Sequence, residues 1–283
     1  MLVTLNEVLP KAQAGHYAVG LFNTVNLEMA KGVLRAAEET RSPVIIGTAE
    51  VLLPYASLEE LAAFLKPMAQ KASVPVVLHF DHGLTKEKIM EAIHLGFTSV
   101  MYDCSAVSYE ENVRRVAEMT RTAHAAHVTV EAELGHVGTN EGGSAESDGA
   151  EDRSLYTEPD QAKEYVERTG VDALAVAIGT AHGAYVHTPK LDLERLHEIR
   201  STLDTPLVLH GGSGLSQEDF RATIRGGISK VNIFTDINTA AANAAKDNWQ
   251  PGRGMTDLMG PIAQAVYEET TRKMELFGCC GKG

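Results

Sequence analysis

Apolar and polar positions follow one another in a regular order of short apolar runs and helical segments. A helical pattern follows most of the apolar runs, as in strands that alternate with helices. The runs, many of them rich in β-branched residues, cover residues 18–23, 43–49, 75–82, 99–105, 128–135, 173–183, 206–214 and 230–236. Continuous apolar runs are typical of parallel strands buried on both faces. Eight such units predict a single (β/α)8 TIM barrel over residues 1–283, with extra helices near the C-terminus.

An open, doubly wound sheet is the structural alternative. It usually has fewer strands and a glycine fingerprint near its first strand, and this chain lacks that fingerprint. Helix-start signals agree with the barrel, because Ser57 is followed by Glu60, and Ser216 by Asp219, at the spacing of a capping box. The barrel is therefore the predicted fold.

Residues 136–158 form a polar, glycine-rich segment that is too long for an ordinary turn between a strand and a helix. The segment comes directly after the fifth predicted strand, at the end where barrel enzymes carry their catalytic groups. We predict a mobile active-site loop there.

Composition excludes several classes of partner. The chain has 25 basic and 38 acidic residues, a formal charge of −13, and no basic run that would bind nucleic acid or an anionic membrane. No apolar run approaches the ~20 residues that span a bilayer, and the N-terminus has the spacing of an amphipathic helix, not of a secretory signal. Three cysteines, Cys104, Cys279 and Cys280, fit a reducing compartment better than a disulfide scaffold. We expect a cytoplasmic protein with a mobile Cys279-Cys280 tail.

Polar side chains gather at the ends of the predicted strands. Only these positions converge at the mouth of a barrel. They are Asn23, Asp81, His82, Asp103, Glu133, His182, His210, Asn232 and Thr235. Three imidazoles leave the fourth position of a tetrahedral zinc ion open for water or substrate. Asp103 and Glu133 offer oxygen ligands for a second or displaced metal position, or hydrogen bonds that orient the imidazoles.

Each histidine alone is weak support for a metal site, because a buried histidine is more often simply hydrogen-bonded. Their shared place at strand ends favours the metal site. His79 and His136 are candidates to orient the ligands. We expect the histidines on predicted helices or before strands to be structural or solvent-facing: His16, His94, His124, His127 and His197.

Glycine-rich and polar segments follow the last two predicted strands. Gly211 to Gly214 and Asn232 to Thr235 lie where many barrels bind a phosphate through backbone amides. Glycine pairs are also ordinary turn residues, but beside a metal site they favour a phosphorylated substrate.

Two segments resemble the signatures of class II, metal-dependent ketose-bisphosphate aldolases, the family of fructose- and tagatose-1,6-bisphosphate aldolases. They are Val-Val-Leu-His-Phe-Asp-His-Gly (76–83) and Val-Glu-Ala-Glu-Leu-Gly-His-Val-Gly-Thr-Asn-Glu (130–141). The likeness extends over nearly the whole chain. The loop beyond Glu141 and the Cys279-Cys280 pair depart from the family's usual form.

The resemblance implies a role for each candidate residue. His82, His182 and His210 would bind the catalytic zinc, and Asp103 and Glu133 would serve an additional metal position. Asp81 would be the proton donor and Glu141 the base. Dihydroxyacetone phosphate would lie against Asn23, Gly183, Gly211, Gly212, Ser213, Asn232, Ile233, Phe234 and Thr235, with a monovalent cation, Na⁺ or K⁺, near the phosphate. The family's habit implies a homodimer or homotetramer.

The predicted reaction is the reversible cleavage of a ketose 1,6-bisphosphate, or a related ketose 1-phosphate, to dihydroxyacetone phosphate and an aldehyde. Pocket shape decides between fructose and tagatose, so both stay open. Arg253 is a candidate for the distal phosphate, from a neighbouring subunit or as a solvated loop residue. A Schiff-base mechanism needs an amine at the mouth. We expect Lys230, at the start of its strand, to lie toward the opposite end.

Two other functions stay open. A barrel metallohydrolase could use the same imidazoles to activate water. A non-catalytic barrel could instead stabilise a partner aldolase.

Overall fold

The computed structural model describes residues 1–139, 155–183, 185 and 189–283. Eight parallel strands pair in the order β2-β3-β4-β5-β6-β8-β10-β11, and β11 pairs back onto β2, so that the sheet closes. The strands are β2 (Val19–Asn23), β3 (Val44–Ala49), β4 (Val76–Gly83), β5 (Ser99–Tyr102), β6 (Thr129–Leu134), β8 (Ala173–Val176), β10 (Leu207–Leu209) and β11 (Ile228–Ile233). Each of the eight predicted apolar runs contains or overlaps one of them, and the predicted (β/α)8 barrel is confirmed.

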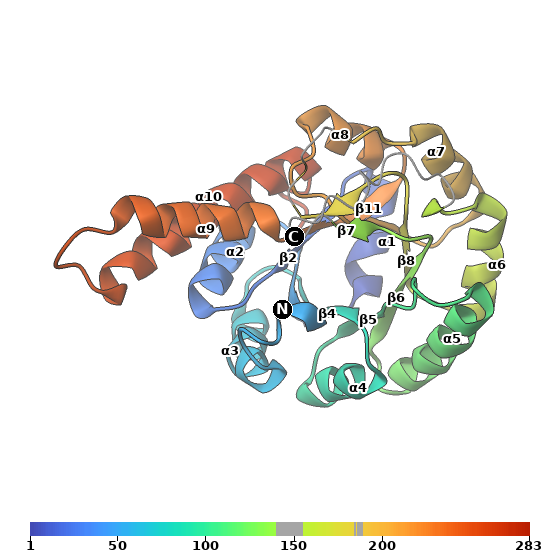
Figure 1. Ribbon diagram of the computed structural model, residues 1–283, viewed down its shortest axis with the longest axis horizontal. Helices are drawn as coiled ribbons and strands as arrows, with labels where there is room; N and C mark the ends of the chain where they lie inside the picture. Colours follow the sequence, from blue (N-terminus) through green and yellow to red (C-terminus); the bar gives the residue numbers. More distant parts are fainter. Residues whose placement is uncertain (140–154, 184, 186–188) are drawn as a thin grey trace.

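Helices surround the barrel on the outside (Figure 1). They are α1 (Leu5–Gly15), α2 (Leu27–Thr40), α3 (Leu58–Lys71), α4 (Lys86–Leu95), α5 (Tyr109–Ala125), α6 (Pro159–Thr169), α7 (Leu193–Thr202), α8 (Gln217–Arg225), α9 (Thr235–Asn248) and α10 (Met255–Phe277). Ser57 and Ser216 cap α3 and α8 as predicted, since each side chain accepts a hydrogen bond from the third residue of its helix.

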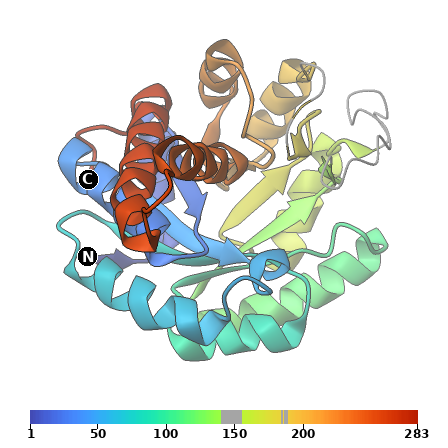
Figure 2. The same cartoon turned by 60° about the vertical axis from the view of Figure 1, so that its left-hand side comes forward.

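The predicted C-terminal helices are present as α9 and α10, which pack on each other and extend away from the barrel (Figures 1 and 2). Helix α10 also packs on α2. Residues 249–254 make the turn at the far end of this helical hairpin. None of the helices in the described part of the chain is long and apolar enough to cross a membrane.

The tail after α10 is packed against the barrel, contrary to the prediction of a mobile tail. Cys279 is fully buried in the hydrophobic core, and its thiol donates to the carbonyl of Met274. The amides of Gly281 and Gly283 bond the carbonyls of Thr40 and Arg41 at the end of α2. The sequence prediction was wrong because a cysteine is a small apolar residue that packs well in a core.

Four short elements complete the described chain. They are β1 (Leu2–Val3), which pairs with β4, the 3₁₀ helix η1 (Glu50–Leu52), and the strands β7 (Gly138–Thr139) and β9 (Ala181–His182), which pair with each other. The predicted mobile loop after β6 falls mainly on residues 140–154, outside the described residues.

Candidate active site

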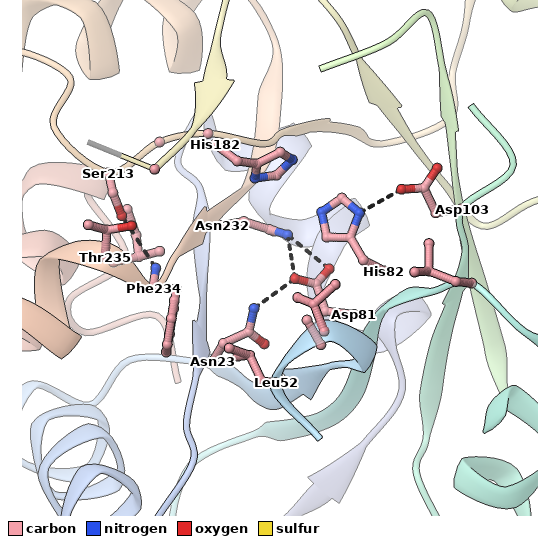
Figure 3. A pocket seen from close by; sticks show the side chains of 17 residues that line it. Asn23, Leu52, Asp81, His82, Asp103, His182, Ser213, Asn232, Phe234 and Thr235 are labelled. Atoms are coloured by element: carbon pink, nitrogen blue, oxygen red, sulfur yellow. Dashed lines mark hydrogen bonds and ion pairs between the residues drawn. The ribbon is translucent and has the colours of Figure 1, made fainter. Parts of the chain in front are cut away.

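The end of β4 brings two consecutive side chains to the mouth of the barrel. In a regular strand neighbouring side chains point to opposite faces, so Asp81 and His82 could not both face the site. His82 instead has a φ of +41°, in the left-handed region, and the register with β5 shifts between Phe80 and Gly83. This backbone conformation costs about 1–3 kcal/mol. It turns the imidazole into the pocket beside Asp81, as Figure 3 shows.

His182 and His210 come from neighbouring strands of the barrel. His182 ends β9, where its backbone pairs with Thr139 of β7, so the two loops after β6 and β8 are tied together. His210 directly follows β10 and is fully buried. The next residue, Gly211, has a φ of +65°, and a Cβ there would lie 2.4 Å from the carbonyl oxygen of Ala181. Only glycine fits this close approach of the two loops.

The three imidazoles converge with one carboxylate, and we name this set the metal-ligand cluster. It consists of His82, His182, His210 and Glu133, whose ligand atoms lie within 4.8 Å of one another. The ring centroid of His82 is 4.7 Å from that of His182 and 4.5 Å from that of His210. His82 Nε2, His210 Nδ1 and Glu133 Oε2 are buried and have no hydrogen-bond partner among the residues that the structure describes. Unpaired nitrogen and oxygen atoms that face one another fit a bound cation, because such atoms are costly to bury otherwise.

Each buried ligand histidine is oriented through its other ring nitrogen. His82 Nδ1 lies 2.8 Å from Asp103 Oδ2, and His210 Nε2 lies 2.8 Å from Glu131 Oε1. Asp103 is itself held by the backbone amide and hydroxyl of Ser105. Asp103 therefore has an orienting contact here, whereas Glu133 belongs to the metal-ligand cluster.

Burial and neighbouring charges shift the pKa values of the cluster in two directions, so that two members are deprotonated at neutral pH and two hold a proton. Burial lowers the pKa of His182 well below its usual value, and burial and His82 lower that of His210, so both rings are neutral at pH 7. Burial also acts to lower the pKa of His82, but Asp81 and Asp103 raise it to about 9. Burial and the nearby charge of Asp103 raise the pKa of Glu133 to about 8. The cluster without a cation thus carries protons at neutral pH.

Asp81 is fixed by two side-chain amides from other strands. Asn23 Nδ2 donates to Asp81 Oδ2 at 2.7 Å, and Asn232 Nδ2 donates to Oδ1 and Oδ2 at 3.0 and 3.2 Å (Figure 3). Burial acts to raise the pKa of Asp81, but His82, the nearby His79 and the charge of Lys230 keep the pKa well below its usual value. Asp81 is therefore a carboxylate with a fixed orientation.

Beneath the metal-ligand cluster lies a second set of buried polar groups, which we name the lower layer: His79, Glu131, Lys230 and Asn232. His79 Nδ1 lies 2.8 Å from the hydroxyl of Ser99, and His79 Nε2 lies 3.7 Å from Asp81 Oδ1. His79 is thus placed to orient Asp81. The other such candidate, His136, is exposed and contacts the hydroxyl of Ser105.

Lys230 does not lie toward the opposite end of the barrel, as the sequence indicated. It is fully buried, and its ammonium group contacts Glu131 at 2.8 Å and Asn232 at 2.7 Å. The strand begins two residues earlier than the sequence indicated, at Ile228, so Lys230 is its third residue, and the long side chain reaches Asn232, two residues nearer the mouth.

The pocket above the cluster has a volume of about 270 Å³. Most of the residues that line it were predicted from strand ends: Asn23, Asp81, His82, Asp103, His182, Gly183, Gly211, Gly212, Ser213, Asn232, Ile233, Phe234 and Thr235. An apolar side of the pocket was not predicted from the sequence; it is formed by Ala49, Val51, Leu52 and Leu84. They also follow strands, but a search for polar strand ends passes over them.

Three predicted residues in the described part of the chain do not line the pocket, and a fourth lies outside that part. His210 and Glu133 are buried below its surface. Glu141 lies outside the described residues. Arg253 lies in the turn between α9 and α10, where it is exposed and donates to the carbonyl of Asn248 at 2.7 Å.

The predicted phosphate segments lie side by side at the pocket wall. Ser213 Oγ accepts hydrogen bonds from the amides of Phe234 and Asp236, at 3.3 and 3.4 Å, where α9 begins. Tyr185 was not predicted: its hydroxyl donates to the carbonyl of Gly211 at 2.7 Å and accepts from the amide of Ala181. These bonds join the segment after β10 to α9 and to the loop that carries His182.

A family model described as "Fructose-bisphosphate aldolase class-II" matches residues 3–282. The chain belongs to the class II fructose-bisphosphate aldolase family. This class II aldolase is 45% identical over 268 residues to the uncharacterized protein YdjI of Escherichia coli K12, with 94% of each chain covered. It is 40% identical over 308 residues to the fructose-bisphosphate aldolase of Thermus caldophilus, with 100% of each chain covered.

The solved structures agree with this assignment. The aldolase superposes on the crystal structure of the YdjI aldolase from Escherichia coli K12 with a TM-score of 0.87 and 39% sequence identity, covering 100% of this chain and 99% of that one. The predicted family and enzyme class are confirmed. The protein is a carbon–carbon lyase of a family that acts on phosphorylated sugars and is typically metal-dependent. This favours the lyase reaction over the two other functions that the sequence left open.

Proposed function

We propose that this aldolase uses Zn²⁺ to cleave a ketose 1,6-bisphosphate, of the fructose or tagatose type, or a related ketose 1-phosphate. The products are dihydroxyacetone phosphate and an aldehyde such as glyceraldehyde 3-phosphate. The observation that carries the proposal is the convergence of three imidazoles and Glu133 with unpaired ligand atoms. Nitrogen donors favour zinc over magnesium or calcium, which prefer oxygen.

His82, His182 and His210 would hold the zinc ion, with Glu133 as a further or alternative ligand. The bound ion would supply a Lewis acid that polarises the substrate carbonyl. Asp103, which the family resemblance assigns to an additional metal position, contacts His82 instead. We propose that it orients this imidazole and becomes a ligand only if a second metal position is filled.

Asp81 is the proposed proton-transfer group. In the cleavage direction it would take the proton from the hydroxyl group next to the bond that breaks, and in condensation it would return that proton. Its two amide partners, Asn23 and Asn232, support this role because they fix the carboxylate at the pocket floor. Glu141 is proposed as the base that exchanges the carbon-bound proton.

The phosphate of dihydroxyacetone phosphate is proposed to bind between Gly211 to Ser213 and Asn232 to Thr235, with Gly183 and Asn23 nearby. These segments line one pocket, and the 14-residue helix α9 begins there. A helix N-terminus and free backbone amides attract an anion despite the acidic net charge. A monovalent cation, Na⁺ or K⁺, is proposed beside the phosphate.

Arg253 is proposed to meet the distal phosphate from a neighbouring subunit of a homodimer or homotetramer. Its place in the turn of the helical hairpin, with no part in the pocket of its own chain, supports this reading. We expect Arg253→Ala to raise the KM of bisphosphate sugars about tenfold, the size of one lost charged contact, and to spare monophosphate sugars. An unchanged ratio of the two Michaelis constants would exclude the role.

The central experiment is chelation followed by zinc add-back, with cleavage of fructose- and tagatose-bisphosphate, longer ketose phosphates and unphosphorylated controls as the readout. We expect cleavage to disappear on chelation and to return with zinc. Full activity in metal-free protein would contradict the zinc mechanism. Equal cleavage of the unphosphorylated sugars would contradict the phosphate site.

A further inference from the structure

Lys230 is buried in the lower layer, and its polar contacts within the described part of the chain are all with acceptor atoms. Its ammonium group donates to Glu131 Oε1 at 3.0 Å and to Asn232 Oδ1 at 2.7 Å, and it lies 2.8 Å from Glu131 Oε2. An ammonium group has three donors and no acceptor. The hydrogen-bond roles of both partners are therefore fixed by Lys230.

The first consequence concerns Asn232. A side-chain amide has nearly the same shape when its oxygen and nitrogen exchange places, so a neighbour must decide its orientation. Lys230 requires the amide oxygen, and the amide nitrogen then faces Asp81 at 3.0 and 3.2 Å. With the opposite orientation, an oxygen of Asn232 would face the Asp81 carboxylate, and two acceptors would meet without a proton.

The second consequence concerns His210. Since the ammonium group of Lys230 contacts both oxygens of Glu131, Glu131 is held as a carboxylate, which can only accept hydrogen bonds. The shorter contact of His210 Nε2, at 2.8 Å to Glu131 Oε1, then places the proton on this nitrogen, although Asn232 Nδ2 also lies 3.3 Å from it. In a neutral imidazole the other nitrogen carries the lone pair. That nitrogen, Nδ1, is the buried atom without a partner, 3.4 Å from Glu133.

We propose that Lys230 is a positioning residue for the lyase reaction: it sets the tautomer of His210 through Glu131 and the orientation of Asp81 through Asn232. One ammonium group thereby prepares both a metal ligand and the proton-transfer group. The proposal rests on the proposed zinc function. It also explains why this buried amine is no Schiff-base nucleophile, since its donors are held by Glu131 and Asn232.

The tautomer can be measured in the native, metal-free protein by NMR of ¹⁵N-labelled histidines, with the His210→Asn variant to assign the signal. We expect His210 to be neutral with its proton on Nε2. A proton on Nδ1 would overturn the proposal. This measurement needs neither zinc nor sugar. A wild-type protein that failed to bind zinc would contradict the proposed function, but the tautomer of His210 would still test the role of Lys230.

The variant Lys230→Met removes the ammonium group and keeps the length of the side chain. We expect zinc affinity, measured by chelator competition, and kcat each to fall about 10- to 100-fold, as for other groups that orient metal ligands. The KM of the sugar should change little, because Lys230 does not line the pocket. Zinc affinity and kcat both within about twofold of wild type, far less than this range, would overturn the proposal.

Lys273→Met is the matched control. Lys273 is also a buried lysine, but it pairs with Asp236 and Glu269 and not with the metal-ligand cluster. We expect this control to lose stability and to keep its zinc affinity. A parallel loss of zinc affinity would show that replacing any buried lysine by methionine weakens zinc binding. This result would overturn the specific role of Lys230.

The double variant Lys230→Met/Glu131→Gln covers the case in which the single variant does not fold, because it leaves no unpaired charge. If Lys230 only neutralises Glu131, the double variant should regain zinc affinity and kcat together with stability, which would overturn the proposal. If Lys230 is a positioning residue, the double variant should regain stability alone.

Discussion

The metal-ligand cluster and the lower layer are both buried and polar, but they differ in how their charges are paired. In the cluster, His82, His210 and Glu133 each keep an atom without a partner. In the lower layer, the ammonium group of Lys230 is paired with Glu131 and Asn232, although His79 Nε2 and Glu131 Oε2 make no hydrogen bond within the described residues. A buried atom without a hydrogen bond costs about 1–3 kcal/mol. The comparison indicates that a bound cation would stabilise the upper set, whereas the ammonium group of Lys230 already supplies a positive charge to the lower set.

The strongest way to break this comparison is to remove a cluster member. His210→Ala should lose zinc and reduce kcat/KM about ten-thousandfold, since a metal ion contributes several kcal/mol to transition-state stabilisation and each 1.4 kcal/mol is tenfold. Metal analysis and the cleavage assay check this together. Loss of stability with zinc still bound would mean that His210 is only structural.

Asp81→Asn should separate chemistry from metal binding. Asn23 and Asn232 both donate to Asp81, and an amide accepts less well than a carboxylate. We expect kcat to fall about a thousandfold, within the range for general acid–base catalysis, while zinc stays bound. Steady-state kinetics and metal analysis test this. An unchanged kcat would remove Asp81 from the reaction.

The protons on the cluster make zinc binding depend on pH. Below their raised pKa values of about 9 and 8, His82 and Glu133 hold protons that compete with the cation. Raising the pH removes this competition, so zinc affinity should rise about tenfold or more per unit between pH 6 and 8, with proton release. Calorimetry in buffers of different ionisation enthalpy measures the protons. A zinc affinity that does not change with pH would contradict the prediction that His82 and Glu133 carry protons.

A lower-layer variant should have the smallest effect. His79→Gln removes a contact to Ser99 and a neighbour of Asp81, but no metal ligand. We expect kcat to fall about tenfold, at the low end for groups that orient an active site, with zinc affinity unchanged. Chelator competition beside the cleavage assay is the check. A loss of zinc would mean that the two layers are one metal site.

The sequence predicted the barrel because apolar runs and helical segments alternate regularly along the chain. The convergence of the polar strand ends then follows from the barrel, since these ends meet at its mouth. His82, His182 and His210 are far apart along the chain, and the fold alone brings them within 4.8 Å. The roles of the individual side chains remain predictions. Glu141, outside the described residues, is not placed at all.

The lower layer was missed for a different reason. Glu131 and Lys230 lie in the middle of strands, and the pattern does not tell which mid-strand side chains reach the barrel axis or how far they extend. The apolar pocket wall was missed because Val51 and Leu84 look like ordinary core or surface residues until η1 and the end of β4 are placed. Glu50 joins these segments by accepting from the amide of Leu84 at 2.7 Å.

The left-handed backbone at His82 has a consequence for protein engineering. A designer who grafts the three histidines onto another barrel by matching strand positions would obtain a ring that points into the wrong face, because Asp81 and His82 are adjacent. The graft must include the irregular end of the strand, from Phe80 to Gly83, as one unit. Library screens that optimise only side chains on an ideal template would not recover this site.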